Sequence, residues 1–145
     1  MKLNIGCGND YREGYVNIDV SRAVEADEYF DITDGIPFNS DVFEEVVINN
    51  VLCQIEKNDD FISVVNELWR ICEGDIYVRV PNASHICAYQ DPMDCRRFTP
   101  ESFTYLDHRH RRYKQYGKHY GFKPFYVTII SDNGRQMEFK LTPKK

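Results

Sequence analysis

The sequence predicts an α/β protein with a mostly parallel sheet that ends in an antiparallel hairpin. Short apolar and β-branched runs recur through the first half of the chain and fit buried strands. An amphipathic helical pattern lies between two of these runs, and an Asn-Gly pair separates two alternating runs near the C-terminus. The 145 residues, of which 42% are hydrophobic, are enough for a core, so we expect one domain over residues 1–145.

The first three predicted strands are short. Residues 3–5 form a buried strand that continues into Gly6-Cys7-Gly8, residues 15–20 form a second strand that ends in an acid, and residues 28–32 form a third. The first two strands are joined by fewer residues than the roughly dozen that a parallel crossover normally needs. We therefore expect the first crossover helix to be shortened or absent. One sheet face near these strands should then be poorly covered and buried by a partner chain in a homodimer.

The middle of the chain has a strand-helix-strand pattern. Residues 43–48 and 75–80 fit two buried strands, and residues 59–72 between them repeat apolar side chains at the spacing of one helix face. This βαβ unit predicts parallel strands joined by a right-handed crossover. Residues 125–131 and 136–142 then flank the Asn-Gly turn and predict the closing hairpin.

Residue types near the helix ends predict their boundaries. Asn58 or Asp59 is expected to cap the helix N-terminus, and Gly74 is suited to the turn beyond its end. Thr99-Pro100 places a capping residue and a proline before a second, shorter helix near residues 101–106.

The clearest candidate site joins the first two strands. Gly6 and Gly8 follow the first strand directly, and Asp19 ends the second. Glycines let the chain turn tightly and let a ligand lie against bare backbone, while a carboxylate at the next strand tip can accept from two ribose hydroxyls. In such a sheet these groups meet at the carboxyl ends of the strands.

The charge near this motif favours one ribose cofactor over another. A pyrophosphate ligand would favour a third glycine and a helix N-terminus, whereas Gly8 is followed by Asn9-Asp10-Tyr11. S-adenosylmethionine carries a sulfonium and an ammonium group, and both suit an acidic site. An NAD- or nucleotide-binding domain stays as the less favoured alternative.

Three segments together resemble the class I, Rossmann-like S-adenosylmethionine-dependent methyltransferases, and in particular small, uncharacterised bacterial and phage-type members. They are LNIGCGNDYREGYVNID, FDITDGIPFNSDVFEEVVINNVLCQI and NELWRICEGDIYVRVP. Those enzymes continue with a segment similar to PNASHICAYQDPMDCRRFTPESF, so the resemblance covers about residues 3–106. It implies a Rossmann-like sheet, S-adenosyl-L-methionine as cofactor and methyl transfer as the activity.

The resemblance also implies which residues bind the cofactor. The methionine part would be lined by Gly6, Cys7 (through its backbone) and Gly8, with Asn49 contacting the methionine or sulfonium region. Asp19 would hold the ribose, Val20 would lie beside the adenine, and Asp31 and Ile32 would face the adenine edge.

The catalytic groups are less well defined. Family members often carry a histidine and a Glu-His pair after the fourth strand, where this chain has Asn50 and Cys53-Gln54. We therefore take His85, Asp91 and His108 as candidate general bases, although His85 can equally be a loop histidine bonded to backbone. A catalytically inactive S-adenosylmethionine-binding module in an assembly is the main alternative function.

Charge is divided unevenly along the chain. Residues 1–75 carry 17 acidic and 5 basic side chains, a net charge of −12, and the remaining residues carry +7. The basic side chains of residues 108–123 alternate with tyrosines, which suits a phosphate-bearing acceptor or a nucleic acid, or else forms a solvated helix or loop over the acceptor site.

Composition predicts the remaining properties. No apolar run reaches the roughly 20 residues of a membrane span, and the first residues lack the apolar stretch of a signal peptide. The five cysteines are scattered without a CxxC pair, which favours reduced thiols and a cytoplasmic protein. The spacing of the His and Cys residues matches no common metal site, so we expect no metal.

Overall fold

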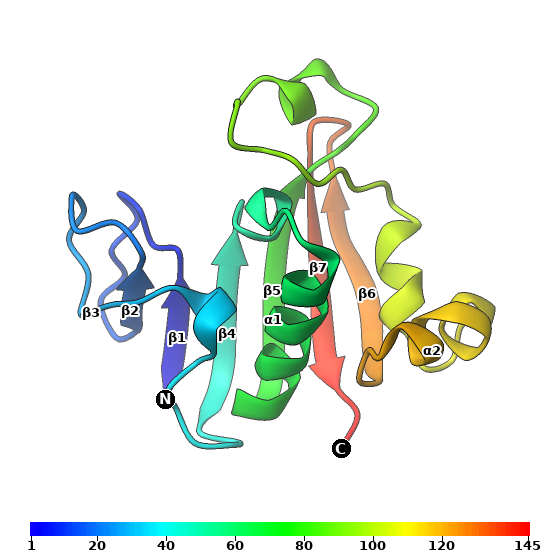
Figure 1. The fold of residues 1–145 in the computed structure, drawn as a ribbon, viewed down its shortest axis with the longest axis horizontal. Helices are drawn as coiled ribbons and strands as arrows, with labels where there is room; N and C mark the ends of the chain where they lie inside the picture. The colour runs from blue at the N-terminus through cyan, green and yellow to red at the C-terminus, as the bar shows by residue number, and fades with distance from the viewer.

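The computed structural model describes residues 1–145 and forms one seven-stranded sheet in the order β3-β2-β1-β4-β5-β7-β6 (Figure 1). The neighbours from β3 to β5 are parallel, whereas β7 is antiparallel to both β5 and β6. This confirms the predicted mostly parallel sheet with a C-terminal antiparallel hairpin. The strands are β1 Lys2–Ile5, β2 Val16–Asp19, β3 Glu28–Tyr29, β4 Phe43–Asn49, β5 Cys72–Pro81, β6 Phe125–Asp132 and β7 Gln136–Pro143.

One long helix accompanies the sheet. The 14-residue α1, Asn58–Ile71, connects β4 to β5 and lies against β5, whereas no helix separates β1 from β2. The predicted absence of the first crossover helix is thus confirmed. No helix in the structure has both the length and the apolar character that crossing a membrane requires. The other helical segments are η1 Ile32–Asp34, η2 Leu52–Gln54, η3 Ile86–Tyr89, η4 Ser102–Leu106, η5 Tyr113–Gly117 and α2 Lys118–Tyr120.

The boundaries of α1 differ from those that the sequence predicts. Lys57 occupies the N-cap without a side-chain cap, so neither Asn58 nor Asp59 caps the helix. Helix α1 then passes directly into β5 at Cys72, and Gly74 lies inside that strand instead of in a turn. A Cβ on Gly74 would lie 1.9 Å from the carbonyl oxygen of Glu44, at an irregularity in the β4–β5 register. This glycine therefore permits close backbone approach.

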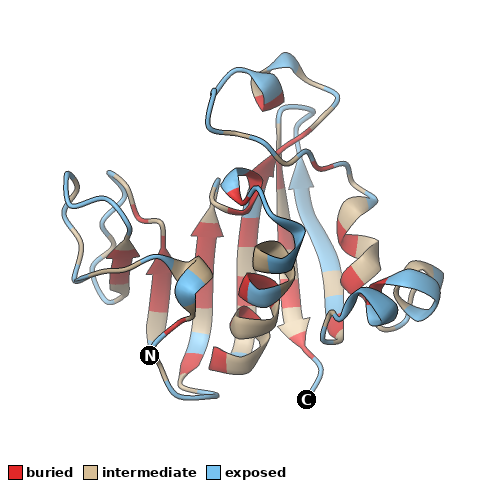
Figure 2. Ribbon diagram, in the orientation of Figure 1, coloured by how far each residue is buried: buried red, intermediate tan, exposed pale blue.

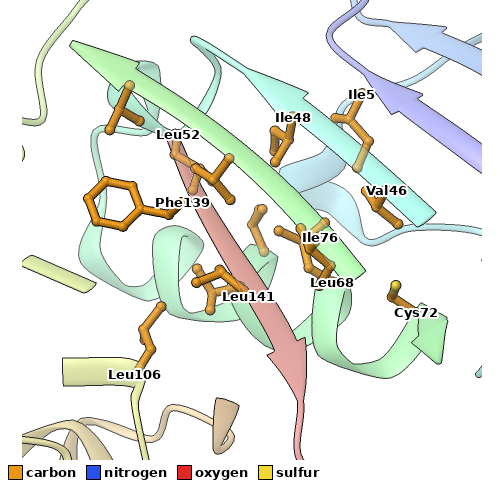
Figure 3. Packing of buried hydrophobic residues seen from close by; sticks show 14 of the residues in the cluster. Ile5, Val46, Ile48, Leu52, Leu68, Cys72, Ile76, Leu106, Phe139 and Leu141 are labelled. Atoms are coloured by element: carbon orange, nitrogen blue, oxygen red, sulfur yellow. The ribbon is translucent and has the colours of Figure 1, made fainter. Parts of the chain in front are cut away.

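The core lies between the sheet and its α1-facing elements. Alternate residues of the central strands, such as Ile5, Val46 and Ile76, are buried there together with Leu68 of α1 (Figure 3). Figure 2 shows that burial is concentrated on the central strands, whereas most of the edge strand β6 is exposed. The 25 clustered buried residues form one continuous core.

The opposite sheet face carries no crossover helix and is polar. Its alternate positions form cross-strand ion pairs, Lys2–Glu45 between β1 and β4 and Arg79–Glu138 between β5 and β7. The predicted poor coverage of this face is therefore found, but its surface is charged. Burial of the face by a partner chain stays a prediction.

Two buried asparagines hold the short connection between β1 and β2, where a crossover helix is absent. Asn4 and Asn17 are register partners on β1 and β2, and Asn4 Nδ2 donates to Asn17 Oδ1 at 3.0 Å. Asn4 Nδ2 also donates to the Asp10 carbonyl oxygen at 2.7 Å, while Asn17 accepts from the Arg12 amide and donates to the Arg12 carbonyl oxygen, both at 2.9 Å. The short connection is thus fixed against the sheet by side-chain amides.

Asn17 also fixes the next connection. Its backbone amide donates to Asp27 Oδ2 at 2.7 Å, and the Asp27 amide donates back to the Asn17 carbonyl oxygen at 2.7 Å. The hydrogen bond from the Asn17 backbone, followed by that from Tyr11, holds the pKa of Asp27 below its usual value. Both loops around β2 therefore depend on one fully buried amide side chain and its backbone.

Replacing Asn17 by Ala should destabilise the protein markedly. The change removes one of the two acceptors of the buried Asn4 amide and the side-chain partner of both Arg12 backbone groups, so the free energy of unfolding should fall by about 1–3 kcal/mol. Asn9→Ala, at an exposed position in the same connection, is the matched control and should leave stability nearly unchanged. Urea unfolding of both variants measures the difference, and equal stabilities would contradict the role of Asn17.

Candidate functional site

A cavity of about 380 Å³ opens at the carboxyl ends of β1, β2 and β4, beside the start of α1. This size lies in the range of small-molecule sites, and the location is where open α/β sheets bind ligands. We call this cavity the acidic cleft. It is lined by Ile5, Gly6, Ile18, Asp19, Val20, Phe30, Asp31, Ile32, Thr33, Asn50, Val51, Gln54, Ile55, Glu56, Lys57 and Asp60.

The glycine bend after β1 forms one side of the acidic cleft. Gly6 and Gly8 have φ values of +63° and +50°, in the left-handed region that favours glycine. A Cβ on Gly6 would lie only 2.3 Å from Cγ2 of Val51, so a side chain there would clash as well. Between the glycines, the Cys7 amide donates to the Ile18 carbonyl oxygen at 3.0 Å. The bend is therefore anchored to β2.

Asp19 is held in a fixed orientation at the tip of β2. Its Oδ2 accepts from the Gly8 amide at 2.9 Å, and its Oδ1 accepts from the Ser21 amide at 2.8 Å. Each carboxylate oxygen has a further lone pair that can accept another hydrogen bond. The carboxylate can thus bind two neighbouring hydroxyls without reorganising.

The far wall of the cleft combines apolar side chains with a second carboxylate. Val20, Phe30 and Ile32 supply apolar surface suited to a flat ring. Asp31 caps η1, because its Oδ1 accepts from the amide of Thr33 at 2.9 Å and from its hydroxyl at 2.7 Å. The backbone around Asp31 is thereby ordered at the cleft edge.

The cleft lining is predominantly anionic. Four carboxylates, Asp19, Asp31, Glu56 and Asp60, line it against a single cation, Lys57. Such a concave site favours a positively charged ligand and disfavours a pyrophosphate. Glu56, Lys57 and Asp60 were not among the residues predicted from the sequence, although the segment that joins β4 to α1 must lie at this end of the sheet.

The structure brings five of the eight predicted cofactor residues to the cleft, namely Gly6, Asp19, Val20, Asp31 and Ile32. The other three lie outside its lining. Cys7 is buried with its Sγ directed at the Glu25 carbonyl oxygen, and Gly8 contributes through its bond to Asp19.

Asn49, the third of these residues, is the last residue of β4 and pairs with Arg79. Alternation along the strand turns its side chain away from the face that buries Ile48. Asn50, with φ +55°, lines the cleft in its place.

The three candidate bases do not line the cleft. His85 and Asp91 lie on the segment that crosses above β5, where His85 Nδ1 accepts from the Cys87 amide at 3.0 Å and Asp91 Oδ1 accepts from the Met93 amide at 2.9 Å (Figure 1). The alternative of a loop histidine bonded to backbone is therefore what the structure contains at His85.

His108 is placed far from the cleft. Its backbone amide donates to the carbonyl oxygen of Phe125, the first residue of β6, and its ring packs edge-on against Tyr126 at 4.6 Å between centroids. Because β6 runs in the same direction as β5, its first residue lies at the end of the sheet opposite the cleft. The basic residues 108–123 follow this edge of the sheet, so they do not cover the acidic cleft.

Cys53 has a structural role after β4. Its Sγ donates to Asp94 Oδ1 at 3.3 Å, and its carbonyl oxygen accepts from the amides of Cys95 and Arg96, both at 2.9 Å. Burial, followed by the bond to Asp94, raises the pKa of the Cys53 thiol to about 12, so the thiol stays protonated at neutral pH. It therefore anchors the segment after β5 instead of serving as a nucleophile.

Comparison with solved structures identifies the fold. A SAM-dependent methyltransferase from Archaeoglobus fulgidus superposes with a TM-score of 0.65 at 11% identity, covering 97% of this chain and 84% of that one. The DhpI–SAM–HEP complex gives 0.66 at 12% identity, covering 98% and 78%. A putative Haloferax volcanii methyltransferase bound to the Trm112 activator gives 0.61 at 14% identity, covering 99% and 82%.

No protein-family model and no curated protein sequence matches the chain. The superpositions on solved structures show that the chain has the fold of the Rossmann-like methyltransferases. Sequence identities of 11–14% establish the fold alone.

Gly6→Ala should destabilise the bend more than Gly8→Ala does. Both positions have positive φ, which costs a non-glycine residue about 1–2 kcal/mol, but only Gly6 lacks room for a Cβ. The clash with Val51 should therefore add about 1–3 kcal/mol. Thermal and urea unfolding compare the two variants, and a Gly8→Ala protein as unstable as Gly6→Ala would show that the clash is relieved freely.

Proposed function

We propose that this chain is an S-adenosyl-L-methionine-dependent methyltransferase that transfers the methyl group to an oxygen or nitrogen of a small or phosphate-bearing acceptor. The observation that carries the proposal is the position of Asp19 in the same cleft as the Gly6 bend, with its carboxylate already oriented. That arrangement suits the two hydroxyls of an adenosyl ribose. Val20, Asp31 and Ile32 then lie where the adenine would extend.

Electrostatics support this cofactor over a dinucleotide. The excess of carboxylates in the cleft complements a sulfonium and an ammonium group, and the connection after Gly8 offers no helix N-terminus for a pyrophosphate. Fold neighbours are consistent with this choice, because solved structures of DhpI are described as complexes with SAM and with SAH.

The proposed mechanism is a direct in-line displacement. The bound cofactor supplies an electrophilic methyl group on a positively charged sulfur, and the acceptor must lie in line with it at about 3–3.5 Å. In this chain the Gly6 bend and Asp19 position the donor, and the cleft carboxylates Glu56 and Asp60 are available to take a proton from the acceptor. His85 stays a proposed base, with Nε2 as the ring nitrogen not used by the Cys87 amide.

One observation favours the second candidate, a binding module without turnover. Gln54 lines the cleft and Cys53 is a protonated structural thiol at the positions where relatives carry a Glu-His pair, and no histidine lines the cleft. Release of S-adenosylhomocysteine in the presence of acceptor panels distinguishes the two functions. We expect the wild type to release S-adenosylhomocysteine and the Glu56→Gln or Asp60→Asn variants to release less of it. Cofactor binding by the wild type without any release would favour the binding module.

The remaining proposals concern assembly and location. A homodimer that covers the open face of β1 and β2 is proposed from the missing crossover helix, although that face carries ion pairs. All five cysteines are free, which supports a protein of the reducing cytoplasm.

Binding of S-adenosylhomocysteine to Asp19→Ala tests the proposal. Loss of the carboxylate leaves the ribose hydroxyls without acceptors, so affinity should fall by roughly 1–3 kcal/mol, about 5- to 150-fold. Asp34→Ala removes an equal charge from an exposed position near the cleft but outside its lining, and should bind like the wild type. Calorimetry gives both affinities.

Two further measurements distinguish a lost ribose contact from a loss of folding. Asp19→Asn keeps the shape of the side chain, and thermal unfolding shows whether the Gly8 contact survives in either variant. Equal affinity for the wild type and for a folded Asp19→Ala protein would contradict the assignment, as would preferential binding of NAD.

A further inference from the structure

A second cavity, of about 530 Å³, lies on the α1 side of the sheet between the first half of α1, η4 and α2. It is lined by 12 residues, of which 8 are hydrophobic, and it shares no lining residue with the acidic cleft. We call it the aromatic cavity. The first turn of α1 separates the two, because Lys57 and Asp60 line the cleft whereas Asn58 and Phe61 line the aromatic cavity.

Aromatic rings form the walls of this cavity. Phe98 stacks on Phe103 with centroids 5.3 Å apart and an angle of 14° between the rings. Phe61 lies 6.0 Å from Phe98 and 5.9 Å from Phe122, so the rings continue around the cavity. Tyr120, which is exposed, stands at the edge. Such walls favour a planar aromatic ligand.

The charge of the cavity is positive and has no counter-charge. Arg96 and Arg97 line it, and no carboxylate does. Arg96 is half-buried and forms no ion pair, in contrast to the paired Arg70 and Arg112. Burial lowers the pKa of its guanidinium, as expected for a cation with no carboxylate partner. The cavity therefore has a cation without a carboxylate partner against an apolar wall.

The geometry of Arg96 leaves part of its guanidinium available. Nε donates to the Ile55 carbonyl oxygen at 3.0 Å, and Nη2 donates to the Glu56 carbonyl oxygen at 3.3 Å and to Asn58 Oδ1 at 3.0 Å. The group lies 4.3 Å from the Phe61 ring centroid. Nη1 makes no hydrogen bond, so a rigidly held donor is left for an anion.

We propose that the aromatic cavity binds a planar aromatic carboxylate, with its ring against the Phe61–Phe98 wall and its carboxylate on Nη1 of Arg96. Arg97 also lines the cavity, while its guanidinium donates to the Asp94 carbonyl oxygen at 2.8 Å and lies over the Tyr89 ring. Asn58 and Ser102 are the uncharged polar side chains of the lining apart from the tyrosine hydroxyls, so few partners exist for the polar edges of a nucleobase. An apolar ring with one anionic group fits these walls better than a nucleotide does.

Titration with 2-naphthoate tests this proposal. Calorimetry measures the affinity, and the NMR signals of the backbone amides of residues 96–106 show where the ligand binds. Arg96→Gln should weaken binding about 10-fold or more, because a charge-assisted hydrogen bond is lost. Arg111→Gln, at an exposed position outside the cavity, should bind within about 2-fold of the wild type because surface charge contributes little. Neutral 2-naphthamide should bind as weakly to the wild type as naphthoate does to Arg96→Gln.

Further variants keep the test decisive if Arg96→Gln is poorly folded. Tyr120→Ala changes an exposed wall residue on a three-residue helix and should weaken naphthoate without loss of stability. Asp19→Ala should leave naphthoate binding unchanged, which separates this site from the acidic cleft. The proposal is overturned if Arg96→Gln and Tyr120→Ala bind like the wild type, if naphthoate fails to bind at millimolar concentration, or if uridine monophosphate binds in an Arg96-dependent manner and naphthoate does not.

Discussion

The hydrogen bond between Asn4 and Asn17 is the constraint on which the rest of this small structure depends. In a parallel sheet the connection between two neighbouring strands normally contains a helix that covers one face. Here the two amides lie side by side on β1 and β2 and bind the backbone at Asp10 and Arg12 instead. Buried amides without such partners would be costly, so the pair and the short connection require each other.

The same constraint shapes the acidic cleft. Because the connection is short and fixed, the Gly6 bend lies directly against the tip of β2, and the amide of Gly8 reaches the carboxylate of Asp19. The cleft is thus ordered without a first crossover helix, and four carboxylates line it. One chain of 145 residues thereby keeps the fold of the solved structures that it superposes on, such as the Archaeoglobus fulgidus protein, of which it covers 84%.

Local patterns predicted the mostly parallel sheet, its C-terminal hairpin and the neighbourhood of Gly6 and Asp19, but not features that arise from long-range contacts. The alternating runs around the Asn-Gly turn and the Gly6–Asp19 spacing are local signals, and both were confirmed as structure. In contrast, the sequence around Gly74 is typical of a glycine that ends a helix. Only the structure shows that the Glu44 carbonyl oxygen occupies the space that a Cβ at this position would need. Likewise, the sequence offers His108 as a candidate base, because it does not show that His108 lies beside the first residue of β6, at the end of the sheet opposite the cleft.

The central proposal is that the Gly6 bend and Asp19 bind one adenosyl group together. A crystal structure of the protein with S-adenosylhomocysteine measures this directly. We expect both ribose hydroxyls within about 3 Å of the Asp19 carboxylate oxygens, with the sugar against the backbone of Gly6 and the adenine beside Ile32. A ligand located elsewhere, or one whose ribose faces away from Asp19, would contradict the account.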